Sequence, residues 1–135
     1  MILADTGPIV AMIVRSDPYH EQAKRSFAAQ RGPVIMTDAC LTETLYFLGR
    51  MSGWRGQAIL WNLVRAGAIN VHASTRDAAL RCAEYMERFK DAPCDYADAS
   101  ILAAAEETAA RQVLTIDGHF HAYRLMDGTA LEIIP

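Results

Sequence analysis

The sequence predicts an α/β fold, a three-layer α/β/α sandwich with a central parallel sheet, in a single domain of residues 1–135. Short apolar segments alternate along the chain with longer segments of helical periodicity. This alternation is typical of βαβ units, whose right-handed crossovers build a parallel sheet covered by helices on both faces. A chain of 135 residues with 52% hydrophobic residues can also bury one core without disulfides.

Five apolar segments are the predicted strands. The first covers residues 2–4 and ends at Asp5, and the last is the LEIIP segment at the end of the sequence. The others cover residues 34–36, 69–72 and 112–117. Apolar residues continue through the strands without polar alternation, which indicates that both faces of the sheet are covered.

Helical segments fill the intervals between the strands. Pro8 suits the first turn of a helix that follows Asp5. Asp17 is the expected N-cap of a second helix, and Thr37 or Asp38 that of a third, which reaches about residue 51. A fourth helix is WRGQAILWNLVRAG, a fifth follows Ser74 and Asp77, which resemble a capping box, and a sixth runs from about residue 95 to 111.

Charge and cysteine content limit the possible classes of function. The net charge is -3, so a nucleic-acid-binding protein of this composition needs a local basic patch or bound cations. The three cysteines show no CxxC spacing, which favours reduced thiols and a cytoplasmic protein. The N-terminal segment MILADTGPIV has no basic region before its apolar run, so we expect no signal peptide and no membrane span.

Four carboxylates lie at or near the predicted carboxyl ends of strands. Asp5 and Asp117 follow the first and fourth strands, Glu43 lies in the helix after the second, and Asp98 lies in the first turn of the helix before the fourth. Ligands of parallel sheets bind beyond this edge, so we expect the four carboxylates to converge there. Asp5 and Asp117 could instead cap the helices that follow them, and Asp98 could pair with Asp95 in a capping box.

Energetics favours a cation site over capping alone. The helical neighbours of Glu43 and Asp98 are apolar, and a buried carboxylate without a partner costs several kcal/mol. Two carboxylates about 4 Å apart repel each other by roughly 4 kcal/mol at an effective dielectric constant near 20. Oxygen ligands suit Mg²⁺ or Mn²⁺, and such an ion at a strand edge suits hydrolysis of phosphodiesters to a 5′-phosphate and a 3′-hydroxyl. Thr6 and Thr115 could orient a carboxylate or a water there, or be ordinary turn and strand residues.

The motifs together resemble those of the PIN-domain ribonucleases, and most of all the small single-domain toxins of the VapC type. They are LADTGPIVA, TDACLTETLYFL, DYADASILAAAEE and VLTIDGHF, in that order, and the resemblance extends from Ile2 to the terminal strand. It implies an endoribonuclease dependent on Mg²⁺ or Mn²⁺. The acids of the family fall on Asp5, Glu43, Asp98 and Asp117, with Asp95 as a cap or a supporting residue.

The resemblance also implies partners. It implies a homodimer and a cognate antitoxin whose tail occupies the acidic groove, beside the RNA substrate. The sequence departs from expectation in having no clear basic cluster. The candidates for holding RNA phosphates are Arg15, Arg50, Arg55 and Arg124.

Several other residues have a chemical and a structural interpretation. His119 and His121 could ligate zinc, but without a third ligand nearby in sequence a surface or structural role is favoured. Cys40 lies in an apolar helix and is expected to pack there. Trp54 and Trp61 could stack on bases, although packing in the core or in a dimer interface is favoured.

Other classes of function remain possible at this stage. A housekeeping PIN-domain nuclease for RNA processing and a non-catalytic module with the same fold are the alternatives. A phosphotransfer enzyme is disfavoured, because the DTGPI segment after the first strand lacks the second aspartate of haloacid-dehalogenase-like phosphatases. The paired acids and late lysine of receiver domains are also missing.

Overall fold

The computed structural model describes residues 1–135 and contains one five-stranded parallel sheet, with the strand order β3-β2-β1-β4-β5. The predicted parallel sheet is therefore confirmed. Its strands are β1 (Ile2–Ala4), β2 (Val34–Thr37), β3 (Ile69–His72), β4 (Gln112–Leu114) and β5 (Glu132–Ile134). The first and third strands have the predicted bounds, whereas β4 ends three residues before the predicted end.

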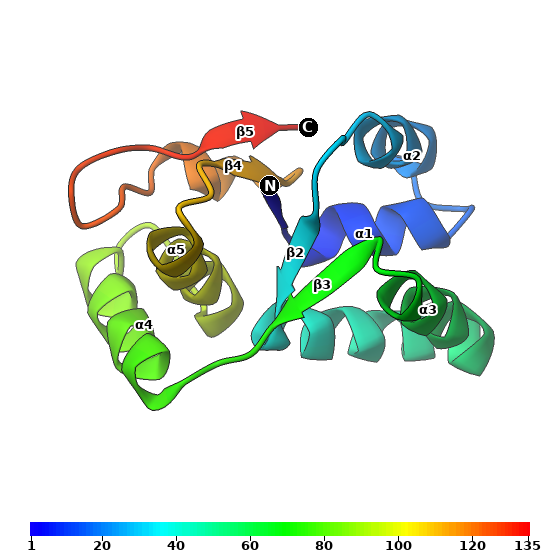
Figure 1. Cartoon of the computed structure of the whole chain (residues 1–135), viewed down its shortest axis with the longest axis horizontal. Helices are drawn as coiled ribbons and strands as arrows, with labels where there is room; N and C mark the ends of the chain where they lie inside the picture. The colour runs from blue at the N-terminus through cyan, green and yellow to red at the C-terminus, as the bar shows by residue number, and fades with distance from the viewer.

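Helices cover both faces of the sheet, which confirms the three layers. Figure 1 shows α4 and α5 on one side and α1, α2 and α3 on the other. The helices are α1 (Thr6–Ile13), α2 (His20–Ala28), α3 (Asp38–Arg65), α4 (Arg76–Arg88) and α5 (Tyr96–Thr108), and a 3-10 helix, η1, spans Gly118–His121. None of the helices is both long enough and apolar enough to span a membrane.

The core explains why the strands read as unbroken apolar runs. Leu3, Met36 and Val113, on three neighbouring strands, are fully buried between the two helical layers. Helix α5 is also buried along most of its length, because its alanines allow close approach to β1 and β2. Asp98 is the one charged residue among the buried residues of α5, so its place needs a separate explanation.

Helix α2 begins later than predicted. Asp17 does not cap it, because the Asp17 carboxylate accepts a hydrogen bond from the Tyr19 backbone N–H at 2.8 Å. The Asp17 carbonyl also accepts the N–H of His20 at 3.0 Å. These two bonds close a tight turn, and the helix starts only after it.

Helix α4 is capped by a neighbour of the predicted residue. The Thr75 hydroxyl accepts the Ala78 backbone N–H at 3.1 Å, so Thr75 is the N-cap and the predicted capping box from Ser74 is wrong. Ser74 instead donates its backbone N–H to the Asp38 carboxylate at 2.9 Å. The loop after β3 is thus tied to the first turn of α3.

Gly53 divides α3 into the two helices that the sequence predicts. Its backbone has φ 60° and ψ -154°, a conformation that is essentially restricted to glycine. A Cβ at this position would meet no atom within 4 Å, so only the backbone conformation demands glycine. The kink turns the second half of α3 back across the helical layer.

We expect Gly53→Ala to lower the free energy of unfolding by about 1–3 kcal/mol, because alanine is strained in this backbone conformation. Gly118→Ala is the matched control, since Gly118 also has open space around it and no positive φ. Urea unfolding followed by circular dichroism measures both. Equal stability of the two variants would contradict a conformational requirement at Gly53.

Candidate active site

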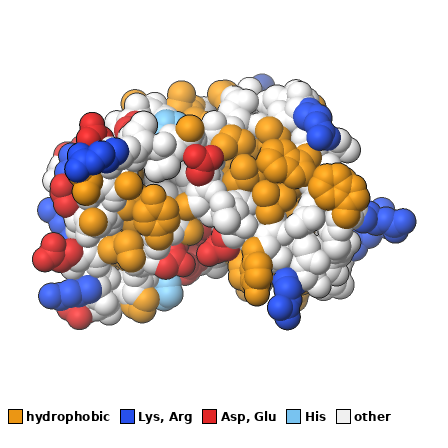
Figure 2. Space-filling model, turned by 90° about the horizontal axis from the view of Figure 1, so that it is seen from below, with side chains coloured by type: hydrophobic (Ala, Val, Ile, Leu, Met, Phe, Trp, Pro, Cys, Tyr) orange, Lys and Arg blue, Asp and Glu red, His pale blue; other side chains and the backbone are white.

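Three of the four predicted carboxylates meet at the carboxyl edge of the sheet. Asp5, Asp98 and Asp117 each place one carboxylate oxygen within 4.8 Å of the others. They line a pocket of about 570 Å³, and Glu43 lines the same pocket from α3. Seen from below the sheet, acidic side chains lie between two groups of hydrophobic side chains (Figure 2).

Asp5 is positioned by the end of β1 and the start of α1. One of its oxygens accepts the Thr6 backbone N–H and the other accepts the Thr115 hydroxyl, both at 2.8 Å. The side chain is buried, with only 7% of its residue surface exposed. Both oxygens are therefore fixed in direction before any ligand binds.

Asp98 occupies the third position of α5 and forms a capping box with Asp95. The Asp95 carboxylate accepts the Asp98 N–H at 2.8 Å, and the Asp98 carboxylate accepts the Asp95 N–H at 3.3 Å. The capping interpretation is thus correct for both residues. Asp98 also faces the other acids, and the Tyr123 hydroxyl lies 3.2 Å from its Oδ2.

Thr115 links the other two acids. Its hydroxyl donates to Asp5 and accepts the backbone N–H of Asp117 at 3.0 Å. Asp117 then caps η1 by accepting the His119 N–H at 2.9 Å. A single threonine after β4 therefore fixes the relative positions of Asp5 and Asp117.

Burial and mutual repulsion change the acidity of the site. Burial, opposed by hydrogen bonds and assisted by Asp117 and Glu43, raises the pKa of Asp5 to about 6. Burial, with the nearby charges of Asp95, Asp5 and Asp117, raises the pKa of Asp98 to about 7. The site therefore carries more negative charge than it can stabilise by itself at neutral pH.

The donor set fits a hard divalent cation. Of the four acids only Asp117 has a basic partner, the imidazole of His119, whose Nδ1 lies 3.2 Å from the carboxylate, and no lysine or arginine pairs with any of them. Three convergent carboxylates without a lysine or arginine are the ligand type that Mg²⁺ or Mn²⁺ prefers. Glu43 stands on the pocket wall, outside the group of three.

Thr6 supports the Asp5 carboxylate through its backbone, and Cys40 packs in the core. The Thr6 backbone binds Asp5, whereas its hydroxyl makes a long 3.5 Å bond to the Cys40 carbonyl. Cys40 is fully buried, and burial raises the pKa of its thiol to about 12. Such a thiol is not a nucleophile at neutral pH, in agreement with the predicted packing role.

Two residues of the pocket, His119 and Asp17, were not predicted to lie near the acids. His119 contacts Asp117, and Asp17 lines the pocket from the turn before α2. The two-residue spacing of Asp117 and His119 was the available signal for the first. No local signal indicates Asp17, because its approach depends on how α1 and α2 pack.

The four arginines that could hold phosphates are placed differently. Arg15 and Arg55 line one depression, which shares Met51 with the acidic pocket. Arg124 donates to the His121 and Tyr123 carbonyls and so braces its own loop. Arg50 is exposed on α3.

Of the two tryptophans on α3, Trp61 is half-buried and Trp54 lies outside the core. Trp54 keeps 65% of its surface exposed and Tyr46 58%, so neither packs in the core. Phe47, at 41%, lines the acidic pocket.

The chain is similar to proteins of known fold. The family profile described as PIN domain matches residues 2–125. The 23S rRNA-specific endonuclease VapC20 of Mycobacterium tuberculosis is 28% identical over 123 residues, which cover 90% of this chain and 93% of that protein.

Solved structures agree with this similarity. The crystal structure of the same VapC20, described as a sarcin-ricin loop cleaving toxin, superposes with a TM-score of 0.81 at 26% identity, covering 90% of this chain and 94% of the other. A toxin-antitoxin complex from Klebsiella pneumoniae shares the fold, with a TM-score of 0.71 at 16% identity and coverage of 100% and 97%.

We expect Asp98→Asn to stabilise the metal-free protein above neutral pH. The raised pKa values mean that the contribution of Asp5 and Asp98 to stability is full below about pH 4 and is lost as the pH rises through about 6 and 7. Asparagine carries no charge to desolvate, so the melting temperature in EDTA at pH 8 should rise, by roughly 4 °C per kcal/mol gained.

Asp91→Asn, at an exposed turn, is the control and should leave the pH profile unchanged. Thermal unfolding between pH 4 and pH 8 gives the comparison. A variant that melts below the wild type at pH 8 in EDTA would show that Asp98 is not electrostatically strained. Added Mn²⁺ should stabilise the wild type and have little effect on Asp98→Asn.

Proposed function

The chain belongs to the PIN-domain family, and from this premise we propose that it is a metal-dependent endoribonuclease and the toxin of a toxin–antitoxin pair. The convergence of Asp5, Asp98 and Asp117 without a lysine or arginine partner is the observation that carries the proposal. The similarity over most of its length to VapC20, an endonuclease specific for 23S rRNA, supports RNA as the substrate.

Asp5, Asp98 and Asp117 would hold Mg²⁺ or Mn²⁺, with Glu43 in reach on the pocket wall. When bound, such an ion lowers the pKa of a water and stabilises negative charge on phosphoryl oxygens. The expected products are a 5′-phosphate and a 3′-hydroxyl.

The residues around the acids hold them in place. Thr115 fixes Asp5 relative to Asp117, and the capping box fixes Asp98 on the rigid start of α5. Because hydrogen bonds already restrain the carboxylates, little conformational entropy is lost on binding an ion.

The whole of residues 1–135 forms the proposed nuclease domain. Its partners are a cognate antitoxin and a second copy of the chain, and the exposed apolar side chains of α3, including Trp54, suit burial in a homodimer. Three free cysteines, all buried, suit a reducing cytoplasm.

RNA would approach the acids past Arg15 and Arg55. Both arginines line the depression next to the acidic pocket, together with Ser16 and Ser52, and neither forms an ion pair within the chain. Phosphates flanking the cleaved one need such a contact, because the acids alone repel them. The two guanidinium groups thus place positive charge next to the acidic pocket, although the net charge of the chain is negative.

Cleavage of RNA by the purified protein tests the proposal. We expect Mn²⁺-dependent cleavage that EDTA abolishes and that Asp98→Asn reduces by at least about a hundredfold, since the bound ion supplies several kcal/mol of transition-state stabilisation. Sequencing of the RNA ends identifies the 5′-phosphate.

The control is Asp91→Asn, which should cleave like the wild type. Full activity of a folded Asp98→Asn protein would exclude the proposed centre. If the wild type binds Mn²⁺ but no RNA is cut, the fold would serve as a non-catalytic module.

We expect Arg15→Ala and Arg55→Ala each to weaken RNA binding and to flatten its salt dependence, by about 0.7 in the slope of log K against log[salt] for each lost phosphate contact. Fluorescence anisotropy with the inactive Asp98→Asn background measures binding without cleavage. Arg88→Ala, on the far helix α4, is the charge-matched control. An unchanged slope in all three variants would place the RNA elsewhere.

A further inference from the structure

A second pocket lies on the same edge of the sheet, between α3, α4 and α5. Its volume is about 190 Å³, the space of roughly six waters at about 30 Å³ each. The residues that matter for its chemistry are Thr37, Asp38, His72, Ser74, Ser100 and Glu107. Small side chains of Ala78, Ala103 and Ala104 form an apolar wall. The acidic centre uses none of these residues.

The first turns of α3 and α5 lie between this pocket and the acidic centre. On α3, Thr42 lines the second pocket and the next residue, Glu43, lines the acidic one. Likewise Tyr96, the first residue of α5, lines the second pocket, whereas its N-cap Asp95 lines the acidic one. The contact between the two helices is direct, with the Thr37 and Ser100 hydroxyls 2.7 Å apart. The two pockets therefore lie about one helix diameter, on the order of 10 Å, from each other.

Each hydroxyl group of the pocket donates its proton in a hydrogen bond within the protein. Ser100 donates to the Ala97 carbonyl at 2.6 Å, so the hydrogen between Ser100 and Thr37 comes from Thr37. Thr42 donates to the Asp38 carbonyl at 2.9 Å, and Ser74 donates to the Thr75 carbonyl at 3.4 Å. These hydroxyls can now only accept hydrogen bonds from a ligand.

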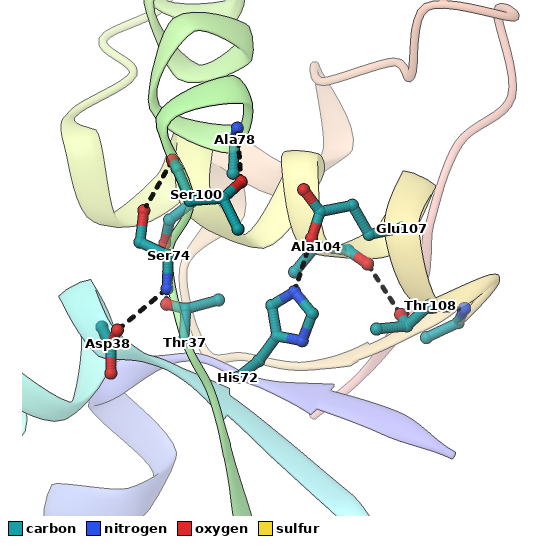
Figure 3. Close-up of polar contacts among 11 residues, drawn as sticks. Thr37, Asp38, His72, Ser74, Ala78, Ser100, Ala104, Glu107 and Thr108 are labelled. Carbon is teal, nitrogen blue, oxygen red and sulfur yellow. Dashed lines mark hydrogen bonds and ion pairs between the residues drawn. The ribbon is translucent and has the colours of Figure 1, made fainter.

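Two carboxylates add further acceptors. Asp38 accepts the Ser74 N–H through one oxygen, and Glu107 lies 2.7 Å from His72 Nε2 through one oxygen (Figure 3). The second oxygen of each carboxylate accepts no hydrogen bond from the protein. A neutral His72 that donates from Nε2 has only the acceptor Nδ1 left. The ligand must therefore supply the N–H donors.

From this geometry we infer that the pocket binds a guanine base of the RNA, next to the cleaved phosphate; the inference rests on the proposed ribonuclease function. Guanine presents two adjacent N–H donors on its Watson–Crick edge, which suit the free carboxylate oxygens of the pocket, whereas adenine, cytosine and uracil place an acceptor beside each donor. Tyr96, 43% exposed at the rim, offers a ring for stacking. An unstacked nucleotide beside the scissile bond can reach across one helix.

The charge of the pocket is compatible with RNA. Glu107 is held by the hydrogen bond from His72, and Asp38 lies in the first turn of α3, where the helix dipole favours a negative charge. A guanidinium group from a protein partner has a similar donor pattern. The base is favoured because the pocket is lined by the same two helices, α3 and α5, that carry Glu43 and Asp98 of the centre that would cut the strand.

Nucleoside binding can be measured separately from cleavage. In a titration followed by NMR of the histidine imidazoles, with His72→Gln to assign the signal, guanosine should shift the His72 resonance more than adenosine, cytidine or uridine. Agmatine supplies a guanidinium group for comparison. A shift with agmatine but not with guanosine would overturn the inference in favour of a protein partner.

Cleavage provides the second test. Asp38→Asn replaces an acceptor by a donor and Ala104→Leu fills the pocket, so each should lower kcat/KM at guanine-containing sites by about ten- to a hundredfold and relax base preference. Glu87→Gln, exposed on α4, is the charge-matched control and should change neither. All three variants should bind Mn²⁺ like the wild type.

The two proposals fail in different ways. If the wild type cuts RNA but the variants keep its rate and base preference, and guanosine does not shift His72, the guanine pocket is excluded and the nuclease stands. If no RNA is cut, the proposed function fails, while a guanosine-specific shift at His72 would still support the pocket.

Discussion

The structure depends on the repulsion between carboxylates that the parallel sheet brings to one edge. Asp5, Asp98 and Asp117 come from three separate segments, and each is held by a backbone N–H: that of Thr6, of Asp95 and of His119. These bonds orient the oxygens, but they do not remove the excess charge, as the raised pKa of Asp98 shows. The fold therefore holds an excess of negative charge that a divalent cation would neutralise.

The contact between α3 and α5 organises both pockets. The Cys40 thiol lies 3.8 Å from the Ala97 carbonyl, and the Thr37 and Ser100 hydroxyls meet on the other side of the same contact. Small residues on α5 permit this close approach. The acids project to one side of the contact and the hydrogen-bond acceptors to the other, so one packing interface fixes the spacing between the two pockets.

Local sequence patterns predicted the strands and the acids at their ends, whereas contacts between distant segments depended on packing. Unbroken apolar runs identified the sheet, and the rule that ligands bind at the carboxyl edge brought Asp5, Asp98 and Asp117 together before the structure was known. Glu43, which was expected to join them, lines the same pocket from α3. Arg15 and Arg55 line one depression, and the position of Arg55 follows from the kink at Gly53. A local sequence pattern can indicate the kink, but it does not show which distant residues the kink brings together.

The charge pattern also implies an order of binding. Without a cation, the acidic centre repels the phosphate that it must hold, and Arg15 and Arg55 on its flank cannot neutralise it at a distance. A bound divalent ion would neutralise most of this charge and offer the phosphate oxygens a cation, so that the arginines and the centre would act on the same strand. A cation at the centre would thus supply the positive charge that a protein of net charge -3 needs in order to bind a polyanion.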